Sequence, residues 1–240
     1  MISIITINLN NKDGLKRTIE SVINQTKFDI IEYIIIDGGS TDGSVDLIKQ
    51  YQDKISYWVS EKDTGIYNAM NKGIDVSTGE YSLYLNSGDY LYTNDVIEKI
   101  MDKLDKDIVY GNEWKINGRV NDPFEWCKGT LKYQWYTANK TNGYLSKYPD
   151  KLTEMFFKTT ALPHQSTFIK TELLKKNKYS EEWKLLGDWL WFRERIMVDG
   201  VSYKHLPIEI SCYGLDGIST RQRKIHEQEK IEYYEKKVNK

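Results

Sequence analysis

The side chains best suited to chemistry stand in three polar clusters within the first ninety residues. These are DGGSTDGS from Asp37, SEKDTG around Asp63, and LNSGD ending at Asp89. Asp89 is a hard oxygen ligand, and Mg²⁺ needs only one or two protein carboxylates when substrate phosphates supply the other oxygens. The last cluster therefore predicts either a metal–diphosphate site with a single protein carboxylate or a plain turn. The residues alone leave both alternatives open.

The first cluster combines a turn with a carboxylate that the turn does not require. Its glycines permit a tight turn, and Ser40, Thr41 or Asp42 can cap a following helix. Asp37 precedes the turn and ends a buried strand, so it is a candidate to accept hydrogen bonds from ribose hydroxyls or a base N–H. Neither GxGxxG nor GxxxxGK[ST] is present, which excludes the dinucleotide fingerprint and the P-loop.

The second cluster leads into a helix with one apolar face. Helical spacing assigns this face to Ile66, Ala69, Met70 and Gly73. An N-capped surface helix would account for the polar residues. We favour a binding role for Asp63 over a plain cap, and Asn71 and Lys72 are further candidates on the polar faces.

Four apolar runs predict the strands that position these clusters. They cover residues 2–7, 33–37, 55–60 and 81–85 and alternate with helical patterns. This β-α-β-α order predicts a parallel sheet with helices on both faces. Ligands of such sheets gather at the carboxyl ends of the strands. All three clusters follow predicted strands, so we expect them at one edge of the sheet.

The second half of the chain gives weaker patterns. Residues 111–163 are rich in Trp, Tyr and Lys, and we expect short strands and loops over the sheet edge. Residues 185–198 and 221–238 read as helices. The aromatic run at 132–136 could stack on a sugar or pack in the core. There is no repeat or low-complexity linker, so we expect one domain over residues 1–240.

Composition limits the class of protein. Apolar residues make up 40% and charged residues 29%, which is ordinary for a soluble domain, and the net charge of −1 gives no field that would attract nucleic acid. Cys127 and Cys212 lack disulfide or CxxC spacing, which suits a reducing compartment. The first residues read as a strand rather than a signal peptide, and no apolar run is long enough to span a membrane. We therefore expect a cytoplasmic protein.

The last helix leaves peripheral contact with the inner face of the plasma membrane as an alternative. Its basic residues could lie on anionic lipid, but its many Glu residues favour a solvated face. The basic residues are Arg221, Arg223, Lys224, Lys236 and Lys237.

Taken in order, several segments resemble the family 2 glycosyltransferases, which are inverting enzymes of the GT-A fold. They are ITINLNN, KRTIESVINQT, IIDGGSTDGS, SEKDTGIYNAMNKGI and LNSGDYL. The resemblance is close over residues 1–110 and looser through PHQSTF (163–168) and LGDWLWFR (186–193). It implies an α/β, Rossmann-like fold with a mostly parallel central sheet and helices on both faces. It also implies a donor-binding half at 1–110 and an acceptor-binding and catalytic-base half at 111–240.

The resemblance assigns roles residue by residue. Asp89 takes the metal-binding place, Asp188 matches the catalytic base, and His164 and Gln165 lie near the acceptor mouth. The expected donor-binding residues, including those proposed from their own chemistry, are Thr6, Asn8, Asp37, Asp63, Asn71, Lys72 and Asn86.

This sequence also departs from the family pattern. Many relatives carry acidic residues where this chain has Asn86 and Gly88, which puts ribose contacts there in doubt. Relatives often have Arg where this chain has Met70. A donor-phosphate contact is then either absent or supplied by Lys72.

Purely structural interpretations also exist for the candidate residues in the second half of the chain. Asp188 opens a helix, and from the residues alone a helix cap or dipole partner is the better interpretation, which the resemblance reverses. His164 could be an ordinary loop histidine. His205 and His226 are too isolated in sequence to be predicted as metal ligands.

The expected function is transfer of a sugar with inversion. The donor is a nucleotide-diphosphate sugar, UDP-linked, with Mg²⁺ or Mn²⁺ as cofactor. The acceptor is a saccharide or lipid-linked hydroxyl in cell-envelope polysaccharide biosynthesis. One alternative is a sugar-nucleotide nucleotidyltransferase, which would carry a Gly-rich, Arg-containing loop where this chain has NLNNKDG. Another is a non-catalytic nucleotide- or saccharide-binding module, which a replacement at Asp89 or Asp188 would have indicated.

Overall fold

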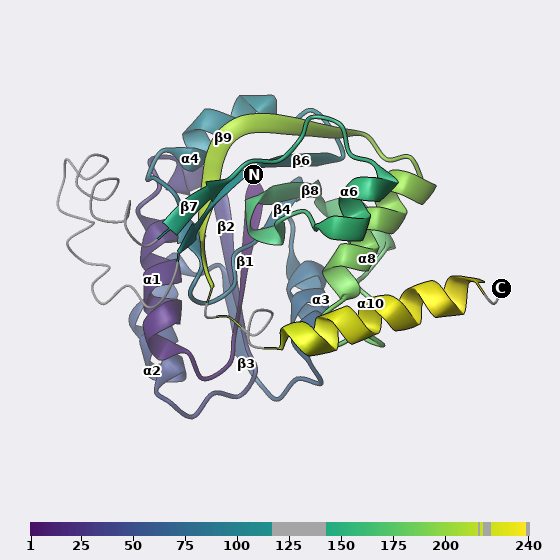
Figure 1. Ribbon diagram of the computed structural model, residues 1–240. Coiled ribbons are helices and arrows are strands. Elements are labelled where there is room, and N and C mark those ends of the chain that lie inside the picture. Colours follow the sequence, from purple (N-terminus) through teal and green to yellow (C-terminus); the bar gives the residue numbers. More distant parts are fainter. Residues whose placement is uncertain (117–142, 216, 218–221, 239–240) are drawn as a thin grey trace.

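One mixed sheet runs through the protein (Figure 1). The computed structural model describes residues 1–116, 143–215, 217 and 222–238. The strand order is β3-β2-β1-β4-β8-β6-β9-β5, and β7 pairs with β6. The strands are β1 (Ile2–Asn8), β2 (Ile31–Asp37), β3 (Tyr57–Ser60), β4 (Tyr81–Tyr84), β5 (Tyr90–Leu91), β6 (Ile108–Ile116), β7 (Gly143–Ser146), β8 (Thr167–Lys170) and β9 (Tyr203–Gly214).

The first four strands form the parallel half that the sequence predicts. β1 lies between β2 and β4 and is parallel to both, and β3 is parallel to β2. The register pairs Asn8 with Asp37 and Asp37 with Ser60. The ends of β1, β2 and β3 are therefore level, and the LNSGD loop after β4 joins this edge through the hydrogen bond from the N–H of Ser87 to the carbonyl of Ile7.

Helices cover both faces of this sheet because its strand residues alternate in direction. Ile4 packs on one side in a core that includes residues of α1, α2 and α4. Ile5 packs on the other side with residues of α3, α6, α7 and α8. In Figure 1, α1 and α3 accordingly lie on opposite sides of β1. The helices are α1 (Lys12–Ile23), α2 (Ser44–Gln50), α3 (Ile66–Val76), α4 (Val96–Ile100), α6 (Glu154–Thr159), α7 (Thr171–Lys176), α8 (Gly187–Arg193) and α10 (Arg223–Val238).

Helix α3 lies unusually close to β1. Ala69, Met70 and Gly73 are buried, and Ile66 is partly buried, as the helical spacing predicts. A β-carbon built on Gly73 would lie 2.4 Å from Cγ2 of Ile5, far inside van der Waals contact. The missing side chain at this position therefore allows the close approach of helix and strand.

The second half differs from the expectation of short elements over the sheet edge. β6 is an interior strand, antiparallel to β8 and parallel to the long β9, and α6 is a helix that we did not predict. Asn112 and Glu113 interrupt the apolar pattern of β6, yet both are buried. Cys212 is buried on β9, whereas Cys127 and the aromatic run at 132–136 lie outside the described residues.

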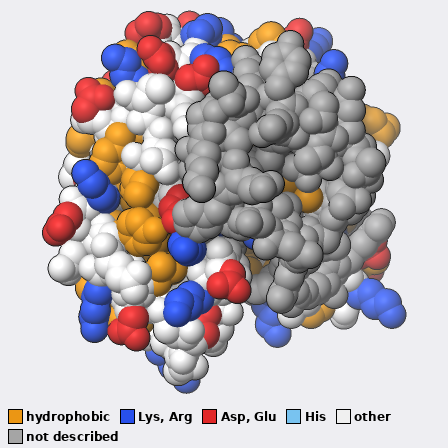
Figure 2. Space-filling model, turned by 90° about the vertical axis from the view of Figure 1, so that its left-hand side faces the viewer, with side chains coloured by type: hydrophobic (Ala, Val, Ile, Leu, Met, Phe, Trp, Pro, Cys, Tyr) orange, Lys and Arg blue, Asp and Glu red, His pale blue; other side chains and the backbone are white. Residues whose placement is uncertain are grey.

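The terminal helix α10 extends away from the sheet (Figure 1). Tyr233 packs edge-to-face on Trp189, and Lys236 forms an ion pair of 2.9 Å with Glu182. Of the basic residues proposed for lipid contact, Arg221 lies outside the described residues. In the part of the chain that is described, no helix combines the length and apolarity that crossing a bilayer requires. On the face shown in Figure 2, the described acidic and basic side chains are intermixed.

Candidate functional site

The carboxylate of Asp37 is the centre of the first polar cluster. Its Oδ1 accepts hydrogen bonds from Asn8 Nδ2 (2.7 Å) and Ser40 Oγ (2.6 Å). Its Oδ2 accepts from Ser60 Oγ (2.6 Å) and from the backbone N–H groups of Gly39 (3.2 Å) and Ser40 (2.9 Å). Burial alone would raise the pKa of Asp37, but these donors lower it. The carboxylate is fully buried and holds the loop together.

The two residues expected beside the nucleotide on β1 differ in what they offer. Thr6 is fully buried, and its hydroxyl lies 2.8 Å from the carbonyl oxygen of Leu85 and 3.1 Å from the hydroxyl of Tyr33. It thus ties β1 to the start of the LNSGD loop. Asn8 donates through Nδ2, but its buried Oδ1 has no partner among the residues that the structure describes. This oxygen has no exposed surface, so it is a buried acceptor within the loop rather than an open contact for a ligand.

Asp63 lies against the glycine turn of the first cluster. A β-carbon on Gly38 would be 2.5 Å from Asp63 Oδ2, so the carboxylate and the turn are in close contact. Its Oδ1 accepts from the N–H of Gly65 at 3.2 Å. Burial raises the pKa of Asp63, and the negative charge of Asp37 adds to this, while the Gly65 N–H and Lys72 oppose it. A partly buried carboxylate with a raised pKa is a good acceptor for an N–H of a ligand.

Asn71 and Lys72 already bind protein groups. The Asn71 side chain donates to the carbonyl of Tyr179 (2.9 Å) and accepts from its N–H (3.0 Å), which fastens that segment to α3. Lys72 forms an ion pair of 2.7 Å with Glu61. Asn71 is buried, so its contacts are those of a structural residue, whereas the ammonium group of Lys72 is partly exposed.

The LNSGD loop is built around the hydroxyl of Thr18 on α1. That hydroxyl accepts the N–H of Gly88 (3.0 Å) and lies 2.7 Å from the carbonyl oxygen of Asp89. Gly88 has φ of +107°, which favours glycine. The Asn11 side chain also donates to the carbonyl of Ser87 at 2.9 Å. These bonds from outside the loop give it a defined shape that a plain exposed turn would lack.

The donor set of this loop fits a divalent ion that arrives with a diphosphate. Asp89 provides one carboxylate and is 7% exposed. Within the described ranges, no group of three or more His, Cys, Asp or Glu side chains is arranged to hold a metal alone. A hard cation that takes most of its oxygens from phosphate needs only one or two protein carboxylates.

Asp188 lies in the first turn of α8 and reaches toward the same edge. Its Oδ1 accepts from the hydroxyl of Tyr67 on α3 (3.0 Å) and from the N–H of Trp189 (2.7 Å). Its Oδ2 lies 3.0 Å from Nδ1 of His164. Burial alone would raise the pKa of Asp188, but the hydrogen bonds and the charge of His164 lower it. Leu186 occupies the cap position, so Asp188 is not the N-cap residue.

His164 joins two segments that are distant in sequence. Its Nδ1 faces Asp188, and its Nε2 lies 3.0 Å from the side-chain nitrogen of Asn86 in the LNSGD loop. Burial would lower the pKa of His164, but the hydrogen bond to Asp188 and the charges of Asp188, Asp89 and Glu113 raise it. The predicted donor loop and the predicted base are therefore linked through one imidazole ring.

Gln165 points to a buried acid that the sequence analysis did not identify. Its side-chain nitrogen donates to the carboxylate of Glu113 on β6, which also accepts from the hydroxyl of Tyr148 at 2.6 Å. Glu113 is only 2% exposed. A charged residue in an apolar strand pattern was the available signal. Tyr67, the other missed residue, stands one helical turn before Asn71 but gave no sign that it would reach Asp188.

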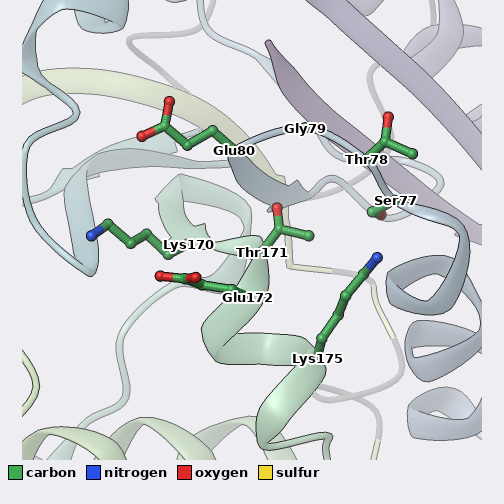
Figure 3. A pocket seen from close by; sticks show the side chains of 8 residues that line it. All are labelled: Ser77, Thr78, Gly79, Glu80, Lys170, Thr171, Glu172 and Lys175. Carbon is green, nitrogen blue, oxygen red and sulfur yellow. The ribbon is translucent and has the colours of Figure 1, made fainter.

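Two other features do not include any of the predicted site residues. His205 lies 2.7 Å from Asp150 through Nδ1 and 3.2 Å from the side-chain oxygen of Asn112 through Nε2. A shallow pocket lined by residues 77–80 and by Lys170, Thr171, Glu172 and Lys175 lies at the amino end of β4 (Figure 3). Its charged groups carry both signs. None of the predicted site residues lines it.

Comparison with known proteins agrees with the resemblance seen in the sequence. The sequence model described as "Glycosyl transferase family 2" matches residues 3–162. An uncharacterized glycosyltransferase of Mycobacterium tuberculosis is 41% identical over 103 residues, which is 43% of this chain and 39% of that protein. The chain thus spans less than half the length of that relative.

Two solved structures are similar in fold. Staphylococcus aureus TarS, in complex with UDP-GlcNAc, matches 92% of this chain and 60% of its own with a TM-score of 0.68 and 18% identity. The mannosyltransferase PcManGT of Pyrobaculum calidifontis, in complex with GDP-Man and Mn²⁺, matches 100% of this chain and 64% of its own with a TM-score of 0.68 and 14% identity. The predicted GT-A fold is confirmed.

Proposed function

Because this chain belongs to glycosyl transferase family 2, we propose that it transfers a sugar from a nucleotide-diphosphate sugar to an acceptor hydroxyl with inversion at the anomeric carbon. The observation that carries the proposal is the link from the LNSGD loop through His164 to Asp188. An inverting transfer needs a base on the side of the sugar opposite the departing phosphate. A carboxylate joined to the donor loop by one ring fits that requirement.

The donor is proposed to be UDP-linked. Asp63 is the proposed acceptor for an N–H or hydroxyl group of the nucleoside, because its carboxylate is only partly buried. Asp37 is proposed to act by holding Asn8 and the glycine turn, since five protein donors from the described residues already occupy its carboxylate. TarS in complex with UDP-GlcNAc is a fold relative with such a donor, although PcManGT carries GDP-Man.

Asp89 is proposed to hold Mg²⁺ or Mn²⁺ together with the diphosphate. When bound, such an ion offsets the negative charge that develops on the leaving nucleotide. Asn86 and Ser87 stand in the same loop and would position the sugar-nucleotide donor through hydrogen bonds, without adding charge. The acceptor is proposed to be a saccharide or a lipid-linked saccharide of the cell envelope, on the strength of the family resemblance.

Asp188 is the proposed base. Its lowered pKa keeps it ionised near neutral pH, so it can take the proton of the acceptor hydroxyl. The acceptor oxygen then forms a bond to the anomeric carbon while the bond to the diphosphate breaks. The electron pair of the broken bond leaves with the nucleotide diphosphate.

A screen of nucleotide sugars for slow donor hydrolysis, with and without Mn²⁺, tests this proposal. Release of UDP from one or a few sugars, and its acceleration by saccharide acceptors, is the expected result. Consumption of UTP with release of pyrophosphate would instead indicate a nucleotidyltransferase. Tight nucleotide binding without turnover across acceptors would indicate a binding module.

A further inference from the structure

Asn86 carries an unexplained polar atom next to the proposed base. Its side-chain nitrogen lies 3.0 Å from Nε2 of His164, while its Oδ1 is buried without a partner in the part of the chain that is described. A buried acceptor without a donor is unfavourable, because it has lost its hydrogen bonds to water without replacing them. The oxygen and nitrogen of an Asn amide have nearly the same shape, and hydrogen bonding decides between the two orientations.

The two orientations imply different charge states of His164. If the Asn86 nitrogen donates to Nε2, the ring is neutral and carries its proton on Nδ1, facing Asp188. If the amide is reversed, Oδ1 accepts from an Nε2–H, and the ring is a cation that donates through both nitrogens. The second arrangement gives the Asn86 oxygen a donor.

The surroundings favour the charged ring. The Asp188 carboxylate lies 3.0 Å from Nδ1 of the ring, and the negative charges of Asp89 and Glu113 also raise the pKa of His164. The side chains of His164 and Asp188 are only 17% and 22% exposed, so water screens their interaction weakly. We infer that the Asn86 oxygen accepts a hydrogen bond from a charged His164.

We propose that His164 and Asn86 are positioning residues for the proposed base. His164 orients the carboxylate of Asp188, and Asn86 fixes the plane of the imidazole ring and ties it to the donor loop. This inference rests on the proposed function of Asp188. It adds a role to the expectation that His164 lies near the acceptor mouth, and it differs from the expectation that Asn86 binds the donor.

The hydrogen bonds also identify the oxygen that takes the proton. A carboxylate oxygen accepts about two hydrogen bonds. Among the described residues, Oδ1 of Asp188 has two donors, Tyr67 and Trp189, whereas Oδ2 has one, His164. Oδ2 therefore keeps a lone pair for the acceptor hydroxyl, and the ring of His164 directs that lone pair.

Two substitutions at position 164 separate the two ends of the ring. His164→Asn places an amide nitrogen near the position of Nδ1 and keeps the bond to Asp188. His164→Gln places its nitrogen near the position of Nε2, beside Asn86, and loses the bond to Asp188. His205→Gln is the matched control, because His205 is also a histidine paired with an aspartate, and its Nε2 faces Asn112 rather than Asn86 or Asp188.

We expect His164→Gln to lower kcat on the order of 10²-fold, since small misplacements of a reacting group cost that much. The donor KM stays near the wild-type value. The acid limb of the kcat profile moves to higher pH, because Asp188 loses a donor that lowers its pKa. His164→Asn keeps the hydrogen bond but not the charge, so its acid limb moves less than that of His164→Gln and most of the rate is kept, and the control changes neither.

A spectroscopic measurement tests the link without turnover. ¹⁵N NMR of histidine-labelled protein should show both nitrogens of His164 protonated at pH 6, and Asn86→Ala should shift the Nε2 signal. An unprotonated Nε2 in the wild type, or an acid limb unchanged in His164→Gln, would overturn the proposal. Wild-type transfer by Asp188→Asn would instead refute Asp188 as the base, with the NMR result still reporting on the link.

Discussion

Replacing Asp188 by Asn changes one atom of the carboxylate and separates its chemical role from its structural one. The Asn oxygen can still accept from Tyr67 and from the N–H of Trp189. The Asn nitrogen then faces Nδ1 of His164, which must give up its proton to accept. The ring keeps its proton on Nε2, and the Asn86 oxygen accepts it. Every hydrogen bond in the series from Tyr67 and Trp189 through residue 188 and His164 to Asn86 is retained, now between neutral groups.

The expected loss of stability is therefore small. A hydrogen bond to a charged group contributes about 1.5–3 kcal/mol and a neutral one about 0.5–1.5, so each of the three bonds to residue 188 weakens by about 1–1.5 kcal/mol. A neutral amide also costs less to bury than a carboxylate, which offsets part of this loss and leaves a net cost of about 1–2 kcal/mol. For a chain of this size, each kcal/mol lowers Tm by about 2–4 °C. We expect Tm to fall by about 2–8 °C. UDP affinity should change by less than about twofold, because the substituted atom lies outside the proposed nucleotide contacts.

The rate should respond far more strongly. Loss of a general base typically slows a reaction on the order of 10²–10⁴-fold, which adds about 2.7–5.4 kcal/mol to the barrier. Sugar transfer, UDP affinity by calorimetry and Tm are measured on the same preparation. If Asp188→Asn transfers sugar at close to the wild-type rate, the base lies elsewhere and our reading of α8 is wrong.

Three further predictions concern the donor loops and pH. UDP should bind more tightly with Mn²⁺ or Mg²⁺ than with EDTA, and calorimetry on Asp89→Asn should show that this difference is lost; equal metal dependence in both proteins would remove Asp89 as a ligand. Asp63→Ala should weaken UDP binding by about 1.5–3 kcal/mol with little change in Tm. Asp37→Ala should lower Tm strongly, because it leaves buried hydrogen-bond donors without an acceptor. The reverse pattern would contradict the assignment of the two carboxylates. The pair of His164 and Asp188 should stabilise the fold most between about pH 4 and 6.5. Its aspartate contribution is lost as pH falls through the lowered pKa of Asp188, and its histidine contribution as pH rises through the raised pKa of His164. The Tm difference between wild type and Asp188→Asn should therefore shrink as the pH rises past the raised pKa of His164, and a difference that grows there would exclude an ion pair.

The parallel half of the fold was predictable because its strands are nearly continuous apolar runs. Buried parallel strands have this pattern, and the polar clusters at their ends had to share one edge. Strand β6 escaped prediction for the opposite reason. Asn112 and Glu113 are buried within it, satisfied by Tyr148 and Gln165, which come from distant parts of the chain. The local sequence around β6 does not predict hydrogen-bond partners that are distant along the chain.

The sequence named candidate residue types for the site, but it did not give the contacts between them. Asp188 and His164 were candidates only through the family resemblance, and their contact depends on how α8 packs. Asp37 was expected to face a ligand, yet register places Asn8 and Ser60 on either side of it as donors. Whether a carboxylate faces a ligand or the protein is decided by tertiary contacts that composition and spacing do not contain.

The absent side chain at Gly73 has an effect well beyond its own position. Helix α3 carries Tyr67 near its amino end, about 9 Å along the axis from Gly73. A methyl group there would meet Ile5 at 2.4 Å, so the helix would have to move away from the sheet. The hydroxyl that contacts Asp188 would move with it. Substitutions at this buried glycine would then look like catalytic defects in a mutational screen, although nothing at that position touches a substrate.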